Sequence, residues 1–131
     1  MNARRMALLV TAAVLACGCD DRKALDVRDV CAPERVRAQT AFVVPVTLEV
    51  AGELDDVECE HVQEDQTLTF TVRGRVVQEC GITAYCPLAT ADCTVPRLDP
   101  GIWTLRFQGR AGVTRAVDVA FEHEPFVCQR N

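Results

Sequence analysis

The stretch AFVVPVTLEV, residues 41–50, alternates large apolar side chains with other residues at a period of two. Its even-numbered positions are Phe42, Val44, Val46, Leu48 and Val50, whereas its odd-numbered positions include a proline, a threonine and a glutamate. Successive side chains of a β-strand point to opposite faces, so this pattern predicts a strand with one buried face.

Three further segments, residues 67–72, 103–107 and 113–121, alternate in the same way. Weaker strand candidates are Val57–Val62, Gly74–Gln78 and Thr94–Leu98. Turn-forming residues separate the segments, and no window has the period of an amphipathic helix. About seven short strands predict an all-β fold, an antiparallel β-sandwich. The aromatic residues expected on its inward faces are Phe42, Phe70, Trp103, Phe107 and Phe121, which leaves Tyr85 and Phe126 free to face a partner.

Two short motifs sharpen the fold prediction. Leu98–Leu105, LDPGIWTL, resembles the L-x-P-G-x-Y-x-L segment of immunoglobulin-like and transthyretin-like domains in bacterial surface proteins, with Trp103 in place of the tyrosine. Ala32–Phe42 is similar to the opening of such domains. The resemblance implies an immunoglobulin-like sandwich in which the Pro-Gly turn crosses between sheets. It implies no activity, because fold motifs carry none.

The N-terminus, MNARRMALLVTAAVLACGC (residues 1–19), has the composition of an export signal. Arg4 and Arg5 precede an apolar run over residues 6–16. About eleven apolar positions are too few to span a bilayer, which takes roughly twenty. The end of the run, LACGC, resembles the lipobox of bacterial lipoproteins, in which small residues precede a cysteine that is acylated after cleavage. The resemblance implies attachment to a membrane through N-terminal acyl chains.

Cysteine parity favours Cys19 over Cys17 as the acylated residue. With Cys19 as the anchor, an even number of cysteines remains, namely Cys31, Cys59, Cys80, Cys86, Cys93 and Cys128. With Cys17 as the anchor, an odd thiol is left over, which is unusual in an exported protein. The expected organisation is a signal peptide over residues 1–18, a lipidated N-terminus with a short acidic tether over 19–30, and a sandwich over 31–131.

The six remaining cysteines are expected to form three disulfides. The chain has no C-x-x-C pair, so it lacks the usual zinc spacing and the thioredoxin-like motif, and an exported chain is oxidised. Pairing of Cys31 with Cys128 would tie the two ends of the domain together. Two of Cys59, Cys80, Cys86 and Cys93 would pin a loop, but six cysteines allow fifteen pairings and the spacing does not choose among them.

Charge and side-chain chemistry exclude several functions. From Cys19 onward the chain carries twelve Lys and Arg against nineteen Asp and Glu, which disfavours nucleic acid as a partner. It contains no serine, no phosphate loop and no dinucleotide motif, so neither catalysis nor a cofactor is expected. Acidic residues surround His61 and flank His123, but they lack the order of a calcium loop, which favours a solvated acidic turn over a metal site.

Binding or a structural role then remains for a monomeric domain in the bacterial cell envelope. A disulfide-pinned loop over Gly81–Asp92 would present Tyr85, Pro87 and Leu88 at little entropic cost. Such a loop could engage a protein partner in the envelope. Inhibition of a protease or another enzyme is one specific form of this hypothesis. The alternative is a purely structural or accessory domain.

Overall fold

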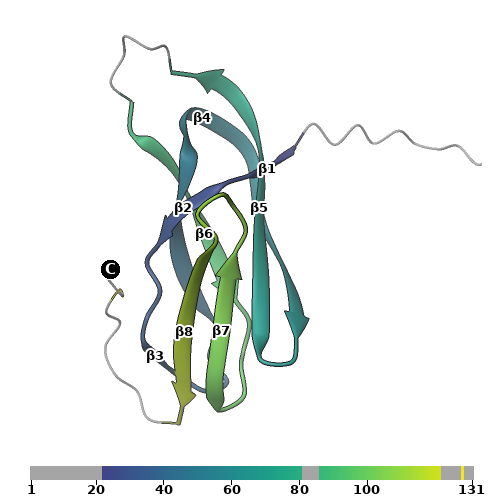
Figure 1. Ribbon diagram of the computed structural model, residues 1–131, viewed down its shortest axis with the longest axis vertical. Helices are drawn as coiled ribbons and strands as arrows, with labels where there is room; N and C mark the ends of the chain where they lie inside the picture. The colour runs from purple at the N-terminus through teal and green to yellow at the C-terminus, as the bar shows by residue number, and fades with distance from the viewer. Residues whose placement is uncertain (1–21, 81–85, 122–127, 129–131) are drawn as a thin grey trace, which may run out of the picture.

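Eight β-strands make up the computed structural model, which describes residues 22–80, 86–121 and 128 (Figure 1). They are β1 (Lys23–Leu25), β2 (Val27–Val30), β3 (Arg35–Arg37), β4 (Phe42–Glu64), β5 (Thr67–Glu79), β6 (Leu88–Val95), β7 (Gly101–Phe107) and β8 (Val113–Ala120). The described residues include no helix, and hence none long and apolar enough to cross a membrane. The fold is therefore all-β, as the period-two patterns predict.

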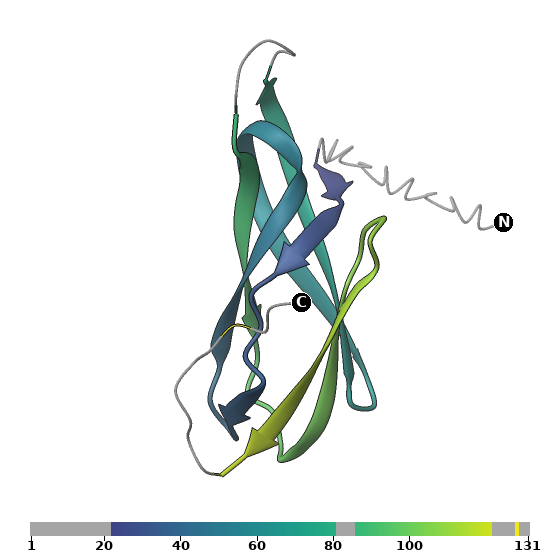
Figure 2. The same ribbon diagram turned by 60° about the vertical axis from the view of Figure 1, so that its left-hand side comes forward.

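The 23-residue strand β4 organises the sheet. Its first half pairs with β2 on one edge and with β6 on the other, and its second half pairs with β5. Near the start of the half that pairs with β5, the register shifts between Asp55 and Glu58, and Asp56 has a φ of 51°. An irregularity of this kind bends a strand. The sheet consequently curls into two walls (Figures 1 and 2).

We call β2, the first half of β4 and β6 the small wall. The large wall consists of the second half of β4 with β5, β7, β8 and β3. Strand β1 also belongs to it, because β1 pairs with the edge of β5 that pairs with β7, further along β5. Strand β5 is parallel to β7, and β3 is parallel to β8. An antiparallel sandwich of about seven strands was expected. The eight strands and two parallel pairs differ from that expectation, because long strands and crossing connections bring segments together in the same direction.

The core lies between the two walls. It is built from the alternate positions that the sequence pattern marks, including Leu48, Phe70 and Leu105, each fully buried. Phe70 of β5 stacks on Phe107 of β7 with ring centroids 5.0 Å apart. None of the described residues that are buried is polar or charged. Burial of this apolar surface is the main favourable term in the folding of such a domain.

The Leu98–Leu105 motif forms the connection from the small wall to the large wall. Leu98 is buried before the turn, Gly101 has a φ of 141°, and β7 then begins in the large wall. The indole Nε1 of Trp103 donates a hydrogen bond to the backbone oxygen of Asp99 at 2.9 Å. The turn thus crosses between the walls, and the indole hydrogen bond stabilises it.

Two expectations from the sequence are corrected. Phe121 was expected to face inward, but it is 76% exposed, because β8 ends at Ala120 and the alternation ends with it. Residues 23–25 and 27–30, expected within a tether, form β1 and β2, which pair with β5 and β4. Strand structure therefore begins well before Cys31, the expected start of the domain.

Candidate functional site

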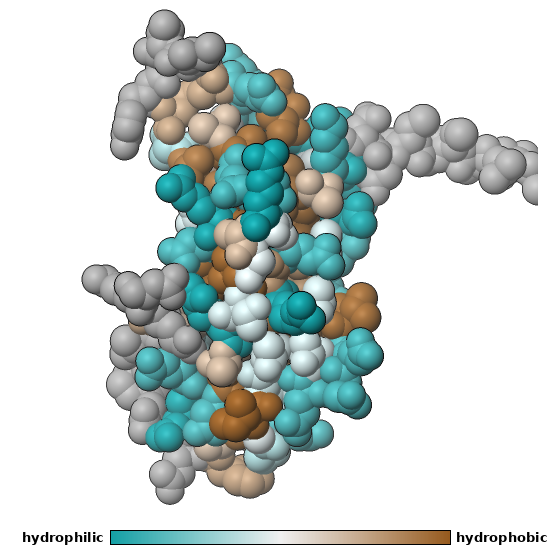
Figure 3. Space-filling view, in the orientation of Figure 1, coloured by the Kyte–Doolittle hydropathy of each residue, from teal (hydrophilic) through white to brown (hydrophobic). Residues whose placement is uncertain are grey.

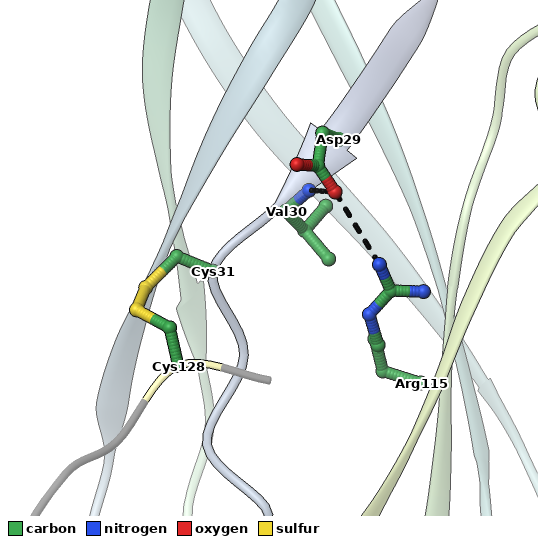
Figure 4. Close-up of a disulfide and its surroundings, with 5 residues drawn as sticks. All are labelled: Asp29, Val30, Cys31, Arg115 and Cys128. Atoms are coloured by element: carbon green, nitrogen blue, oxygen red, sulfur yellow. Dashed lines mark hydrogen bonds and ion pairs between the residues drawn. A yellow bond between two sulfur atoms is a disulfide. The ribbon is translucent and has the colours of Figure 1, made fainter. Parts of the chain in front are cut away.

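Three disulfides join the six cysteines. Cys31, just after β2, bonds Cys128 across 97 residues of sequence (Figure 4). Cys59 of β4 bonds Cys93 of β6 across 34 residues. Cys80 bonds Cys86 across six residues and closes a small loop. The pairing of the two chain ends is the one that sequence position suggested.

The expected binding loop is shorter than Gly81–Asp92. Strand β6 begins at Leu88, whose Cα pairs with that of Ala51 on β4, so residues 88–92 are strand. Pro87 is exposed and Leu88 is half-buried. Tyr85 lies outside the described residues, as do all the residues between Cys80 and Cys86. Of the three predicted contact residues, the structure thus places Pro87 and Leu88 side by side at the start of β6.

An open groove of about 550 Å³ lies against the Cys80–Cys86 disulfide. Its lining comes from the last residues of β5, from a short segment of β4 and from the start of the next connection: Gly52, Glu53, Gln78, Glu79, Cys80, Cys86 and Pro87. Gly52 permits the close approach of β4 and β5 here, because a Cβ atom at this position would overlap the carbonyl oxygen of Gln78. The exposed surface of the groove is mostly apolar, and the carboxylates of Glu53 and Glu79 and the amide of Gln78 lie among its lining residues.

The acidic segment around His61 is a strand, not a solvated turn. Its carboxylates lie on β4 and pair with two arginines of β5 and with the residue before β1: Arg75 with Asp56, Arg73 with Glu60 at 3.2 Å, and Arg22 with Glu58. His61 lies 5.6 Å from the ring of Phe70, measured between ring centroids. No group of three metal-ligating side chains occurs within the described ranges, and His123 lies outside them. The local sequence of this segment does not reveal its arginine partners, because they lie at distant positions in the chain.

The outer face of the large wall carries a row of threonines between charged residues, which the strand patterns did not mark as a site. Thr67, Thr69 and Thr71 follow one another on one side of β5, and the register places Thr104 and Arg106 of β7 beside the first two. Exposed Val62 and Ile102 lie on the same face. In Figure 3 near-neutral residues gather between charged ones over this part of the molecule. The alternation of these threonines with the core residues of β5 is the sequence signal that could have identified this face.

The three contexts give no catalytic arrangement. The described part of the chain contains a groove beside a small disulfide loop, a strand whose carboxylates pair with arginines, and a threonine-rich face. Each can contact a partner, and none combines a nucleophile with a base. Comparison of the chain with protein-family models, with curated proteins and with solved structures found no match.

Proposed function

We propose that the protein is an exported lipoprotein of the bacterial cell envelope, anchored by Cys19 and with a non-enzymatic binding or accessory role. The observation that carries the proposal is the set of three disulfides in a domain of about one hundred residues. Disulfides of this density are typical of oxidising compartments outside the cytoplasm. The signal-like segment and the lipobox resemblance at residues 15–19 agree with that location.

Mass spectrometry of the N-terminal peptide from the membrane fraction tests the anchor. The expected peptide begins at Cys19 and carries acyl chains. Cys19→Ser should release the protein from the membrane, whereas the matched variant Cys17→Ser should leave it attached. An unmodified mature chain that begins at another residue would contradict the proposal, and acylation at Cys17 would move the anchor by two residues.

The binding role is assigned to the end of the domain that carries the Cys80–Cys86 loop. Support comes from the adjoining groove, lined by Glu53 and Glu79, and from the exposed Pro87. A loop closed by a disulfide loses little conformational entropy on docking, which also suits the inhibition of a protease or another enzyme. Of the two, a protein partner in the envelope is the broader proposal and inhibition its special case.

Cross-linking in intact cells separates a binding domain from a structural one. Tyr85→Ala combined with Pro87→Ala should remove cross-linked partners that the wild-type protein acquires. Thr114→Ala, an exposed change on β8, is the matched control and should keep them. Unchanged partners in the loop variant, with the fold intact by circular dichroism, would show that the loop is not the site.

The monomeric state and the immunoglobulin-like relationship are also part of the proposal. Within the described residues the second half of β4 pairs with β5 alone, and its other edge carries acidic residues such as Glu58 and Glu60. Charged edges oppose pairing with a second copy. The wall-crossing Pro-Gly turn supports the immunoglobulin-like relationship, and the parallel β5–β7 pair departs from it. Light scattering of the purified domain should give the mass of one chain.

A further inference from the structure

The first described residues of the chain are attached to the large wall. Arg22 pairs with Glu58 of β4, and Lys23, Ala24 and Leu25 of β1 pair in register with β5. Beneath them Gly74 leaves little space, because a Cβ atom at this position would lie 3.1 Å from the Leu25 side chain and 3.3 Å from that of Val57. The start of β1 is therefore a fixed point on the surface of the domain.

Very little chain separates this point from the proposed anchor. Only Asp20 and Asp21 lie between Cys19 and Arg22. Even fully extended, three residue steps span at most about 11 Å. We propose that this linker holds one face of the domain against the bilayer: the start of β1, the bend of β4 at Asp55–Glu58 and the middle of β5. The inference rests on the proposed acylation of Cys19.

The charges on this membrane-side face suit a position beside anionic lipid. Four basic residues (Arg22, Lys23, Arg73, Arg75) balance four acidic ones (Asp55, Asp56, Glu58, Glu60). Three of the acidic side chains form ion pairs with the arginines. As a whole, the chain from Cys19 onward has an excess of acidic residues, twelve basic against nineteen acidic, which the negative surface potential of the membrane would repel. The described residues of the face nearest the anchor are thus neutral in sum, which weakens that repulsion.

The opposite end of the molecule is kept away from the bilayer by the same geometry. In both ribbon views β3 lies at the far end of the domain from the start of β1 (Figures 1 and 2). Ala41, which is exposed, follows β3 and precedes β4. Ala41 precedes Leu48 by seven residues, and Leu48 pairs with Val27 of β2. Seven residues of extended strand correspond to about 23 Å. Ala24 and Ala41 are therefore matched positions, both exposed, near and far from the proposed contact.

Fluorescence quenching tests the orientation. Lipidated Ala24→Trp and Ala41→Trp variants are reconstituted in vesicles of phosphatidylethanolamine and phosphatidylglycerol that contain a lipid with a nitroxide on its headgroup. The native Trp103 is buried and supplies an equal background in both. We expect quenching of the added tryptophan to be several times stronger at position 24 than at position 41. Equal quenching, or stronger quenching at position 41, would overturn the proposed orientation.

A longer linker shows whether the short connection is the cause. Insertion of about twenty Gly and Ser residues between Asp21 and Arg22 gives an average reach of roughly 25 Å. The insertion should lower the quenching at position 24 toward that at position 41, and unchanged quenching would overturn the role of the linker. Mass spectrometry of the same samples separates the two hypotheses. A chain without acyl groups contradicts the proposed function, whereas an acylated chain with no difference between positions contradicts only the orientation.

Discussion

Cys59 of the large wall and Cys93 of the small wall are joined by a disulfide that crosses the core. Cys93 is fully buried and Cys59 is half-buried, both on inward faces of their strands. The bond lies where the second half of β4 has no strand partner on its outer edge among the described residues. It therefore fixes the spacing of the two walls on the side where hydrogen bonds between strands do not.

Removal of this bond should weaken the domain more than removal of the small loop bond. Loop-closure entropy predicts a loss of about 3 to 4 kcal/mol for Cys59→Ala with Cys93→Ala, and of only about 2 kcal/mol for Cys80→Ala with Cys86→Ala. Denaturant unfolding, followed by the fluorescence of the single tryptophan, measures both. Equal losses would show that the cross-core bond contributes less than its loop-closure entropy, and would contradict the prediction.

Trp103 should stabilise the turn between the walls through its hydrogen bond as well as its burial. Trp103→Phe keeps an aromatic ring in the core but leaves the backbone oxygen of Asp99 without its indole donor. We expect a loss of about 1 to 2 kcal/mol in the free energy of unfolding. Circular dichroism supplies the measurement, since this variant lacks the tryptophan signal. A neutral result would show that water replaces the indole at the turn.

The sequence predicts most of the fold because one face of each strand must be buried. The alternation in residues 41–50 and 67–72 identifies the inward positions of β4 and β5 correctly. It does not show that each pattern continues into the next weak segment to form one long strand. It also misses β1 and β2, since short strands of three and four residues with many charges carry no periodic signal. Pairing of parallel strands depends on long-range packing, which local patterns do not encode.

The candidate site was less accessible from sequence than the fold. Cysteine parity and position favoured the Cys31–Cys128 bond, but spacing could not choose among the other pairings. The acidic segment of β4 suggested exposed charge, whereas its partners, Arg22, Arg73 and Arg75, come from β5 and from the residue before β1. Such ion pairs are set by strand register. Local composition therefore indicates the presence of charge but not its compensation.

Asp29 and Arg115 should be coupled across the seam between β2 and β8. Nη2 of Arg115 donates to Oδ1 of Asp29 at 3.3 Å, and the arginine side chain, on the inward side of β8, is only 11% exposed (Figure 4). Asp29→Ala leaves this cation without its carboxylate and only the backbone oxygen of Thr114 as acceptor, for an expected loss of about 1 to 2 kcal/mol. The double variant with Arg115→Met should recover stability, because no largely covered charge is then left without a carboxylate. Additive losses in the cycle would contradict the coupling.

Gly52 and Gly112 offer matched tests of backbone strain, because both have a positive φ, 139° and 56°, and differ in their surroundings. A Cβ atom at Gly112 has no neighbour within 4 Å, whereas at Gly52 it would overlap the carbonyl oxygen of Gln78 on β5. Gly112→Ala should therefore cost only the conformational term, about 1 kcal/mol. Gly52→Ala adds a backbone clash, and we expect a loss of more than about 2 kcal/mol. Because the clash lies in the groove beside the Cys80–Cys86 bond, hydrogen exchange in the middle of β4 and at the end of β5 should rise in this variant alone. Similar losses and exchange in both variants would show that β4 and β5 move apart at Gly52 with no loss of stability, and would contradict the prediction.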